Sequence, residues 1–207
     1  WFVSRLVEKH RRDNSMHDKD VDDKDHIKVL DFCSTEDVIS ALDRIRCSGG
    51  GDIPEDVLGG LVHAIYGLSW GRSCRNLLLI ADAPPHGERY GDSPAFGVST
   101  MGRFKDGAIP LDVVRGKYTE AVTKVLEAQP GGALTGELVF ELLRRKNITL
   151  TVGIMVDSKT NSPPPGLEQM YQEFSSLGRK AGVTVQRVEL GDAMNVDASF
   201  FKENIVK

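Results

Sequence analysis

Leu77-Leu78-Leu79-Ile80-Ala81-Asp82-Ala83-Pro84-Pro85-His86-Gly87 passes from an unbroken apolar run into a turn rich in proline. A short apolar run bounded by turn residues is typical of a buried strand. Asp82 therefore follows directly on the carboxyl end of a predicted strand. Open α/β sheets bind their ligands outside that edge, so Asp82 is a candidate site residue.

A second segment, Gly49-Gly50-Gly51-Asp52-Ile53-Pro54-Glu55-Asp56, leads from a glycine turn into a helix predicted over residues 54–68. Pro54 is tolerated in the first helical turn, where its missing N–H would have no intrahelical partner. Asp52 is the candidate N-cap of this helix. Carboxylate oxygens suit hard cations, so the carboxylates of this segment and Asp82, on neighbouring loops, predict a divalent-cation site. The alternative is that Glu55 complements the helix dipole and Asp82 caps a turn.

The rest of the chain alternates predicted strands with predicted helices. Strands are predicted over residues 2–7, 27–32, 76–81, 148–156 and 183–190, and helices from residue 34 and over 111–128, 136–146 and 167–181. This alternation predicts an α/β fold of three layers, doubly wound around a mostly parallel sheet. Residues 82–110 form a long predicted loop, and such loops are usually functional or mobile. We expect one domain over residues 1–190 and a tail over 191–207.

Composition narrows the classes of function. The 207 residues are 40% hydrophobic and 27% charged, with a net charge of −4, as in an ordinary globular domain. The negative balance argues against a nucleic-acid partner, because nucleic-acid-binding proteins cluster basic residues. No apolar stretch approaches the ~20 residues that a membrane-spanning helix needs. The three cysteines form no C-x-x-C pair, which favours free thiols and a cytoplasmic location. An extracellular location stays open, because the N-terminus is expected to be missing and a signal peptide could have preceded Trp1.

Both motifs carry a family resemblance, to the von Willebrand factor A (VWA) domain found as the I domain of integrins. Asp52-Ile53-Pro54-Glu55 resembles the D-S-P-E of integrin β subunits, whose Glu is a metal ligand. Asp82 matches the Asp of the third loop of the family's metal site. The longer sequence pattern, with Asp-Ala-Pro-x-His-Gly over residues 82–87, resembles the intracellular branch of the family, which includes VWA-containing α-kinases.

This resemblance implies a Rossmann-like fold and a metal-ion-dependent adhesion site. Such a site holds Mg²⁺, or Mn²⁺ or Ca²⁺, and leaves one coordination position open for an acidic side chain of a protein partner. Glu55 and Asp82 are the metal ligands that the resemblance implies. Asp52 is either a helix cap or a ligand of an accessory metal, and His86 is either a partner contact or a turn residue.

One part of the family pattern is missing. No D-x-S-x-S follows an apolar strand anywhere in the chain, and residues 1–7 resemble the family's second strand. The first strand, which lies at the centre of the sheet in the family, is therefore expected to be absent from this chain. Without that loop, we expect weak metal binding or none.

The predicted function is that of a protein-interaction module without enzymatic activity. The sequence contains no phosphate-binding glycine motif, no G-x-S-x-G and no protein-kinase signature. One alternative is a regulatory domain of a larger enzyme, such as a VWA-containing α-kinase whose kinase activity lies outside this chain. The other alternative is a structural remnant that binds no metal.

Overall fold

The computed structural model describes residues 30–34, 36–37, 40–41, 55–71, 74–91, 107–114, 118–130, 132–156 and 162–192. The predictions for residues 1–29, for Asp52 and for residues 193–207 of the tail lie outside these ranges. The described elements, in chain order, are α2 (Val57–Gly67), β1 (Asn76–Ala81), the 3-10 turn η1 (Glu88–Tyr90), β2 (Ile109–Pro110), α3 (Leu111–Val114), α4 (Glu120–Glu127), β3 (Ala133–Leu134), α5 (Gly136–Lys146), β4 (Thr149–Val156), α6 (Leu167–Ala181) and β5 (Val185–Asp192).

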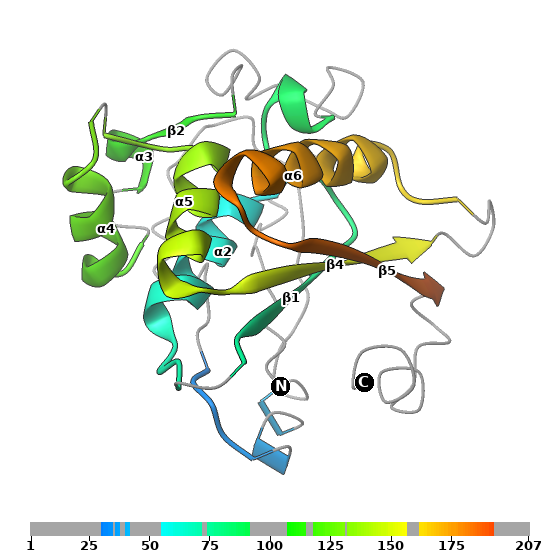
Figure 1. Cartoon of the computed structure of the whole chain (residues 1–207), viewed down its shortest axis with the longest axis horizontal. Coiled ribbons are helices and arrows are strands. Elements are labelled where there is room, and N and C mark those ends of the chain that lie inside the picture. The colour runs from blue at the N-terminus through cyan, green and yellow to red at the C-terminus, as the bar shows by residue number, and fades with distance from the viewer. Residues whose placement is uncertain are drawn as a thin grey trace, which may run out of the picture.

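The described sheet is parallel, with strand order β1-β4-β5 (Figure 1). Leu77 of β1 is in register with Leu150 of β4, which in turn is in register with Val185 of β5. The helical crossovers α5 and α6 connect the strands, as parallel pairing requires. The predicted α/β class is therefore confirmed.

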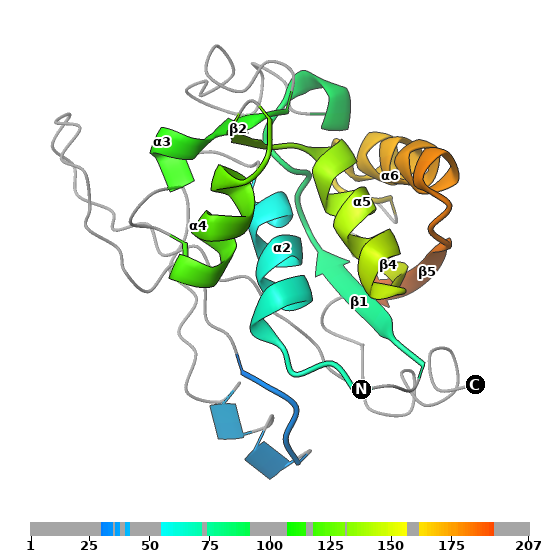
Figure 2. The same cartoon turned by 60° about the vertical axis from the view of Figure 1, so that its left-hand side comes forward.

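Helices α2, α5 and α6 lie side by side against the sheet (Figures 1 and 2). Alternate strand residues such as Leu77, Leu150 and Val152 share one hydrophobic core with these helices. Phe140 of α5 and Phe174 of α6 are fully buried there, with ring centroids 5.5 Å apart. The second helix layer of a doubly wound fold is not among the described helices. None of the helices in the described ranges is both long and apolar enough to cross a bilayer.

The predicted helix over residues 111–128 is wrong as a single element. The helix α3 is described over Leu111–Val114, and a second helix, α4, begins at Glu120. Tyr118, between them, is 8% exposed and donates its hydroxyl hydrogen to Asp56, directly before α2. This tertiary contact takes Tyr118 out of the helical path. In addition, β3 lies inside the predicted breaker over residues 129–134 and pairs antiparallel with β2.

The end of the predicted strand over residues 27–32 is also wrong, because Leu30, Asp31 and Phe32 are not in a strand. The Asp31 carboxylate accepts hydrogen bonds from the N–H of Phe32 and from the N–H of Ser69, each 2.8 Å long. A side chain that bonds nearby backbone in this way offers an alternative to a strand ladder. Residues 27–29 lie outside the described ranges.

Candidate functional site

Two loops meet at the carboxyl edge of β1. The N–H of Glu55 donates to the carbonyl oxygen of Pro84 at 2.9 Å, and Glu55 forms a parallel bridge with Pro85. The segment that enters α2 therefore runs beside the turn that leaves β1. The expectation that the loops of Glu55 and Asp82 are neighbours is thus met. We call this contact the Glu55–Pro85 seam.

Burial differs among the predicted site residues on these loops. Asp82 is exposed, while Glu55 and His86 are half-buried. Within the described ranges, no three His, Cys, Asp or Glu side chains gather closely enough to hold a metal ion. Mg²⁺ is often bound through only one or two carboxylates and keeps several waters. The backbone contacts bring the two loops together but do not test cation binding, so the role of Glu55 and Asp82 as metal ligands stays a prediction.

The true N-cap of α2 is Asp56, and the predicted helix start at residue 54 is wrong. Asp56 is 8% exposed, and its carboxylate accepts the N–H of Gly59 at 3.0 Å and the hydroxyl of Tyr118 at 2.6 Å. Glu55 cannot be helical, because its backbone forms the bridge with Pro85. The helix therefore begins only at Val57, and Asp52 is too far upstream to cap it.

Gly59 leaves room for this buried contact. A Cβ at Gly59 would lie 2.2 Å from the Tyr118 hydroxyl oxygen and 2.4 Å from Oδ2 of Asp56. One turn later, Nδ1 of His63 lies 2.8 Å from the carbonyl oxygen of Gly59, and the N–H of Thr119 donates to Nε2 of His63 at 3.2 Å. The neutral imidazole therefore carries its hydrogen on Nδ1. These contacts fasten the beginning of α2 to the beginning of α4.

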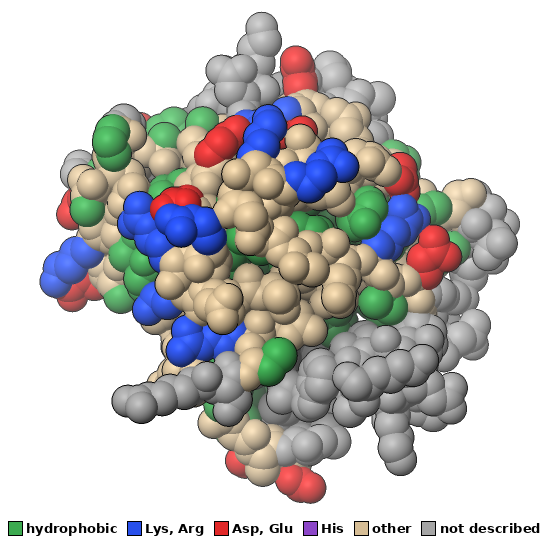
Figure 3. All heavy atoms as spheres, in the orientation of Figure 1, with side chains coloured by type: hydrophobic (Ala, Val, Ile, Leu, Met, Phe, Trp, Pro, Cys, Tyr) green, Lys and Arg blue, Asp and Glu red, His purple; other side chains and the backbone are tan. Residues whose placement is uncertain are grey.

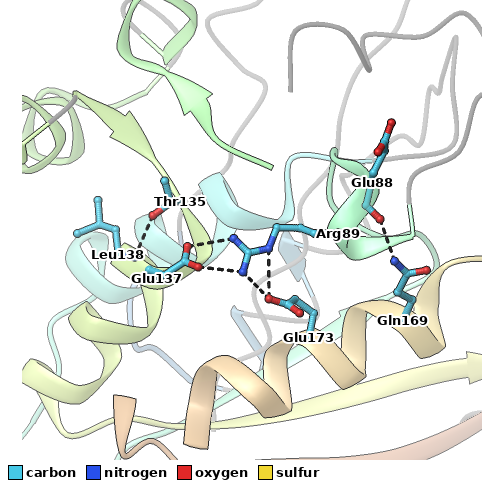
Figure 4. A network of polar contacts seen from close by, with 7 residues as sticks. All are labelled: Glu88, Arg89, Thr135, Glu137, Leu138, Gln169 and Glu173. Atoms are coloured by element: carbon cyan, nitrogen blue, oxygen red, sulfur yellow. Dashed lines mark hydrogen bonds and ion pairs between the residues drawn. The ribbon is translucent and has the colours of Figure 1, made fainter. Parts of the chain in front are cut away.

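The loop after Asp82 continues into η1, which is held by Arg89 (Figure 4). The Arg89 guanidinium bonds both carboxylate oxygens of Glu137 in α5, at 3.2 and 2.9 Å. It also donates from Nε to Glu173 in α6 at 3.2 Å, and its Nη2 contacts the same oxygen. Burial lowers the pKa of Arg89, but the hydrogen bonds to Glu137 and Glu173 outweigh it and raise the pKa above its ordinary value.

Tyr90, the residue after Arg89, holds the same turn by apolar packing. Its side chain is fully buried, and its ring stands edge-on to that of Phe174 with 5.8 Å between centroids. Burial raises the pKa of Tyr90 to about 12. The loop of Gly166, after β4, packs against the same region, because a Cβ at Gly166 would lie 2.7 Å from Cγ of Pro84. The beginning of the long predicted loop is therefore firmly anchored, whereas residues 92–106 lie outside the described ranges.

Basic residues in the last turn of α5 form ion pairs with a glutamate of the same helix. Arg144 and Arg145 both bond Oε1 of Glu141, at 2.6 and 2.9 Å. The hydrogen bonds from these two residues lower the pKa of Glu141 to about 2. Figure 3 shows acidic and basic side chains interspersed on this face of the molecule. This arrangement is typical of a solvated helix end.

Comparison with known proteins gives a partial likeness. No family model matches the chain. A stretch of 58 residues is 43% identical to part of alpha-protein kinase vwkA from Dictyostelium discoideum, and it covers 28% of this chain and 9% of that protein. The chain therefore spans only a small part of the length of that relative. The match agrees with the resemblance to VWA-containing α-kinases but does not establish membership of the VWA family.

Sequence reasoning missed Asp56 and Arg89. A signal for Asp56 was present, because an aspartate directly before the first apolar residue of a helix is a typical N-cap. Arg89 gave no signal, since its partners Glu137 and Glu173 are 48 and 84 residues away in the sequence. Only the packing of η1 on both helices brings the three side chains together.

Proposed function

We propose that this chain is a VWA-type protein-interaction domain and belongs to a larger, cytoplasmic protein. The partner binds at the carboxyl edge of β1 and offers an acidic side chain. A divalent cation, Mg²⁺ or a similar ion, bridges that side chain to the domain. Glu55 and Asp82 contribute two of the cation's ligands, and His86 lies beside them as a partner contact. The domain occupies residues 1–190.

The observation that supports this proposal most is the Glu55–Pro85 seam. It joins the loop of one predicted ligand to the turn that carries the other, over 2.9 Å between the N–H of Glu55 and the carbonyl of Pro84. Asp82 is exposed at this edge and Glu55 is half-buried. A cation held there by carboxylates would keep coordination positions for water or for a partner's carboxylate.

Mn²⁺ titration tests the cation site directly. The wild-type chain should bind Mn²⁺ weakly, with a Kd of about 0.1–1 mM, because two carboxylates are a small ligand set. Glu55→Gln and Asp82→Asn should each weaken binding about tenfold, whereas Glu120→Gln on the exposed face of α4 should not. Unchanged Mn²⁺ affinity in both site variants would contradict the proposal. Absence of binding in the wild type would favour a structural domain that binds no metal.

A second candidate function is that of a regulatory domain in a larger enzyme. The 58-residue likeness to an alpha-protein kinase favours it, because the matched part is 9% of that protein. In this case the chain carries no phosphotransfer activity of its own. A phosphotransfer assay on the 207-residue chain, with ATP and a general protein substrate, should give only background, and clear incorporation of phosphate would refute this assignment.

A further inference from the structure

Contacts hold the loop that carries Asp82 and His86 both at its beginning and at its end. At its beginning, the carbonyl oxygen of Pro84 accepts the N–H of Glu55, and Pro85 forms the parallel bridge with Glu55. At its end, Arg89 is bound to two helices (Figure 4). The two attachments enclose His86 and Gly87, and Asp82 lies just before the first attachment. The second attachment therefore limits how far this part of the edge can move.

Arg89 is suited to fix a position because it joins three separate elements. Glu137 lies in the first turn of α5, and Glu173 lies in the middle of α6. The bond to Glu137 uses both carboxylate oxygens, and such paired bonds fix orientation as well as distance. The Arg89 side chain is 27% exposed, so water screens the contact only in part. Within the same turn, the backbone N–H of Tyr90 donates a hydrogen bond to the carbonyl oxygen of Gly87 at 2.9 Å.

We propose that Arg89 is a positioning residue for the candidate cation and partner site. It holds the loop over residues 82–87 against Glu55 and touches neither the cation nor the partner. The role of Arg89 in cation and partner binding rests on the proposed function. Its role in holding the loop does not, because that role follows from the contacts of Arg89 alone.

The chain offers a matched control in Arg187 of β5. Its guanidinium also lies between two glutamates, Glu168 at 2.6 Å and Glu189 at 3.1 Å. Its side chain is 25% exposed and lies over the ring of Tyr171, as Arg89 lies over that of Tyr90. These partners of Arg187 belong to α6 and β5, so the control removes a similar contact that does not hold the loop.

Hydrogen exchange tests the positioning of the loop without any metal. In Arg89→Gln, the amide hydrogens of Glu55, Tyr90 and Gly91 should exchange about tenfold faster than in the wild type. Amides in the middle of α5 and β4 should keep their rates. Arg187→Gln should leave the three loop amides unchanged. Equal rates in Arg89→Gln and the wild type, or a uniform rise over the whole chain, would overturn the proposal.

Mn²⁺ titration then connects the loop to the site. Arg89→Gln should weaken Mn²⁺ binding about fivefold or more, while Arg187→Gln leaves it unchanged; an unaffected affinity in Arg89→Gln would overturn the positioning role. If Arg89→Gln does not fold, Glu137→Gln removes only one partner and should show the same pattern to a smaller degree. If the wild type binds no Mn²⁺, the proposed function fails, but the exchange rates still decide whether Arg89 orders the loop.

Discussion

Replacing Asp56 by alanine removes the carboxylate that joins the beginning of α2 to Tyr118. The change leaves the N–H of Gly59 and the hydroxyl of Tyr118 without their acceptor, at a position that is 8% exposed. Loss of an N-cap costs about 1 kcal/mol. A hydrogen bond to a charged group contributes roughly 1.5–3 kcal/mol. We therefore expect Asp56→Ala to lower the free energy of unfolding by about 2–4 kcal/mol.

A double-mutant cycle separates the two contributions. Tyr118→Phe removes only the 2.6 Å bond, so Asp56 keeps its contact with Gly59. The single changes should be non-additive, with a coupling energy of about 1.5 kcal/mol or more, because the residues are in direct contact. The assay is urea unfolding followed by circular dichroism, with an unchanged dependence on urea in all variants.

Glu120→Ala serves as the control, because its pair with Lys124 has side chains that are 81% and 69% exposed. Such a pair should contribute about 0.5 kcal/mol or less. A cost of Asp56→Ala as small as that of the control would refute the reasoning. So would full additivity of Asp56→Ala and Tyr118→Phe, since it would mean that their contact carries no free energy.

Three further predictions concern the same edge of the molecule. Gly59→Ala should destabilise the protein in urea unfolding by about 1–2 kcal/mol, although alanine is favoured over glycine in helices by about 1 kcal/mol, because its Cβ would collide with Asp56 and Tyr118. Folding raises the pKa of Tyr90 from 10.0 to about 12, so the free energy of unfolding should be highest below pH 10 and fall by roughly 2 kcal/mol as the pH rises toward 12. Tyr90→Phe should abolish this fall. Burial raises the pKa of Glu137, but the bond from Arg89 outweighs it and lowers the pKa below 4.5. The stability from this pair should therefore be complete above pH 4.5 and be lost in acid, and a pH series of unfolding curves should show a smaller acid loss in Arg89→Gln.

Elements whose ends depend on nearby residues could be predicted from the sequence. The bounds of α5 match the prediction, because the Thr135 side chain accepts the N–H of Leu138 at its beginning and Asn147, with φ of 51°, ends it. The end of α6 is equally local, since Gly182 adopts φ of 74°. Caps of this kind act within one helical turn, so the amino-acid pattern contains them in full.

Elements whose ends depend on distant residues could not be predicted in the same way. The sequence predicts too early a start for α2, because the bridge between Glu55 and Pro85 joins residues that are far apart in the sequence. The predicted helix over residues 111–128 divides where Tyr118 reaches Asp56, 62 residues away. In both cases a tertiary hydrogen bond outweighs a helix propensity of less than about 1 kcal/mol per residue.

The candidate site shows the same division. That the loops of Glu55 and Asp82 are neighbours could be predicted, because turns after parallel strands and the helices beside them gather at one edge of a sheet. How those loops are held could not, because Asp56 and Arg89 act through partners that only the folded chain brings near. The sequence pattern therefore indicates the candidate ligands, whereas the contacts that hold their loops arise only from the packing of the folded chain.

The support of this edge includes polar contacts on both sides of the Glu55–Pro85 seam. On one side the buried carboxylate of Asp56 binds Gly59 and Tyr118, and on the other Arg89 joins α5 and α6. A hydrogen bond is weakened steeply by a change in its angle. Hydrogen bonds on both sides therefore restrict the geometry of the loop. Binding to a loop that is already ordered avoids the entropy cost of fixing it. For the proposed function, an ordered edge of this kind would favour partner binding for the same reason.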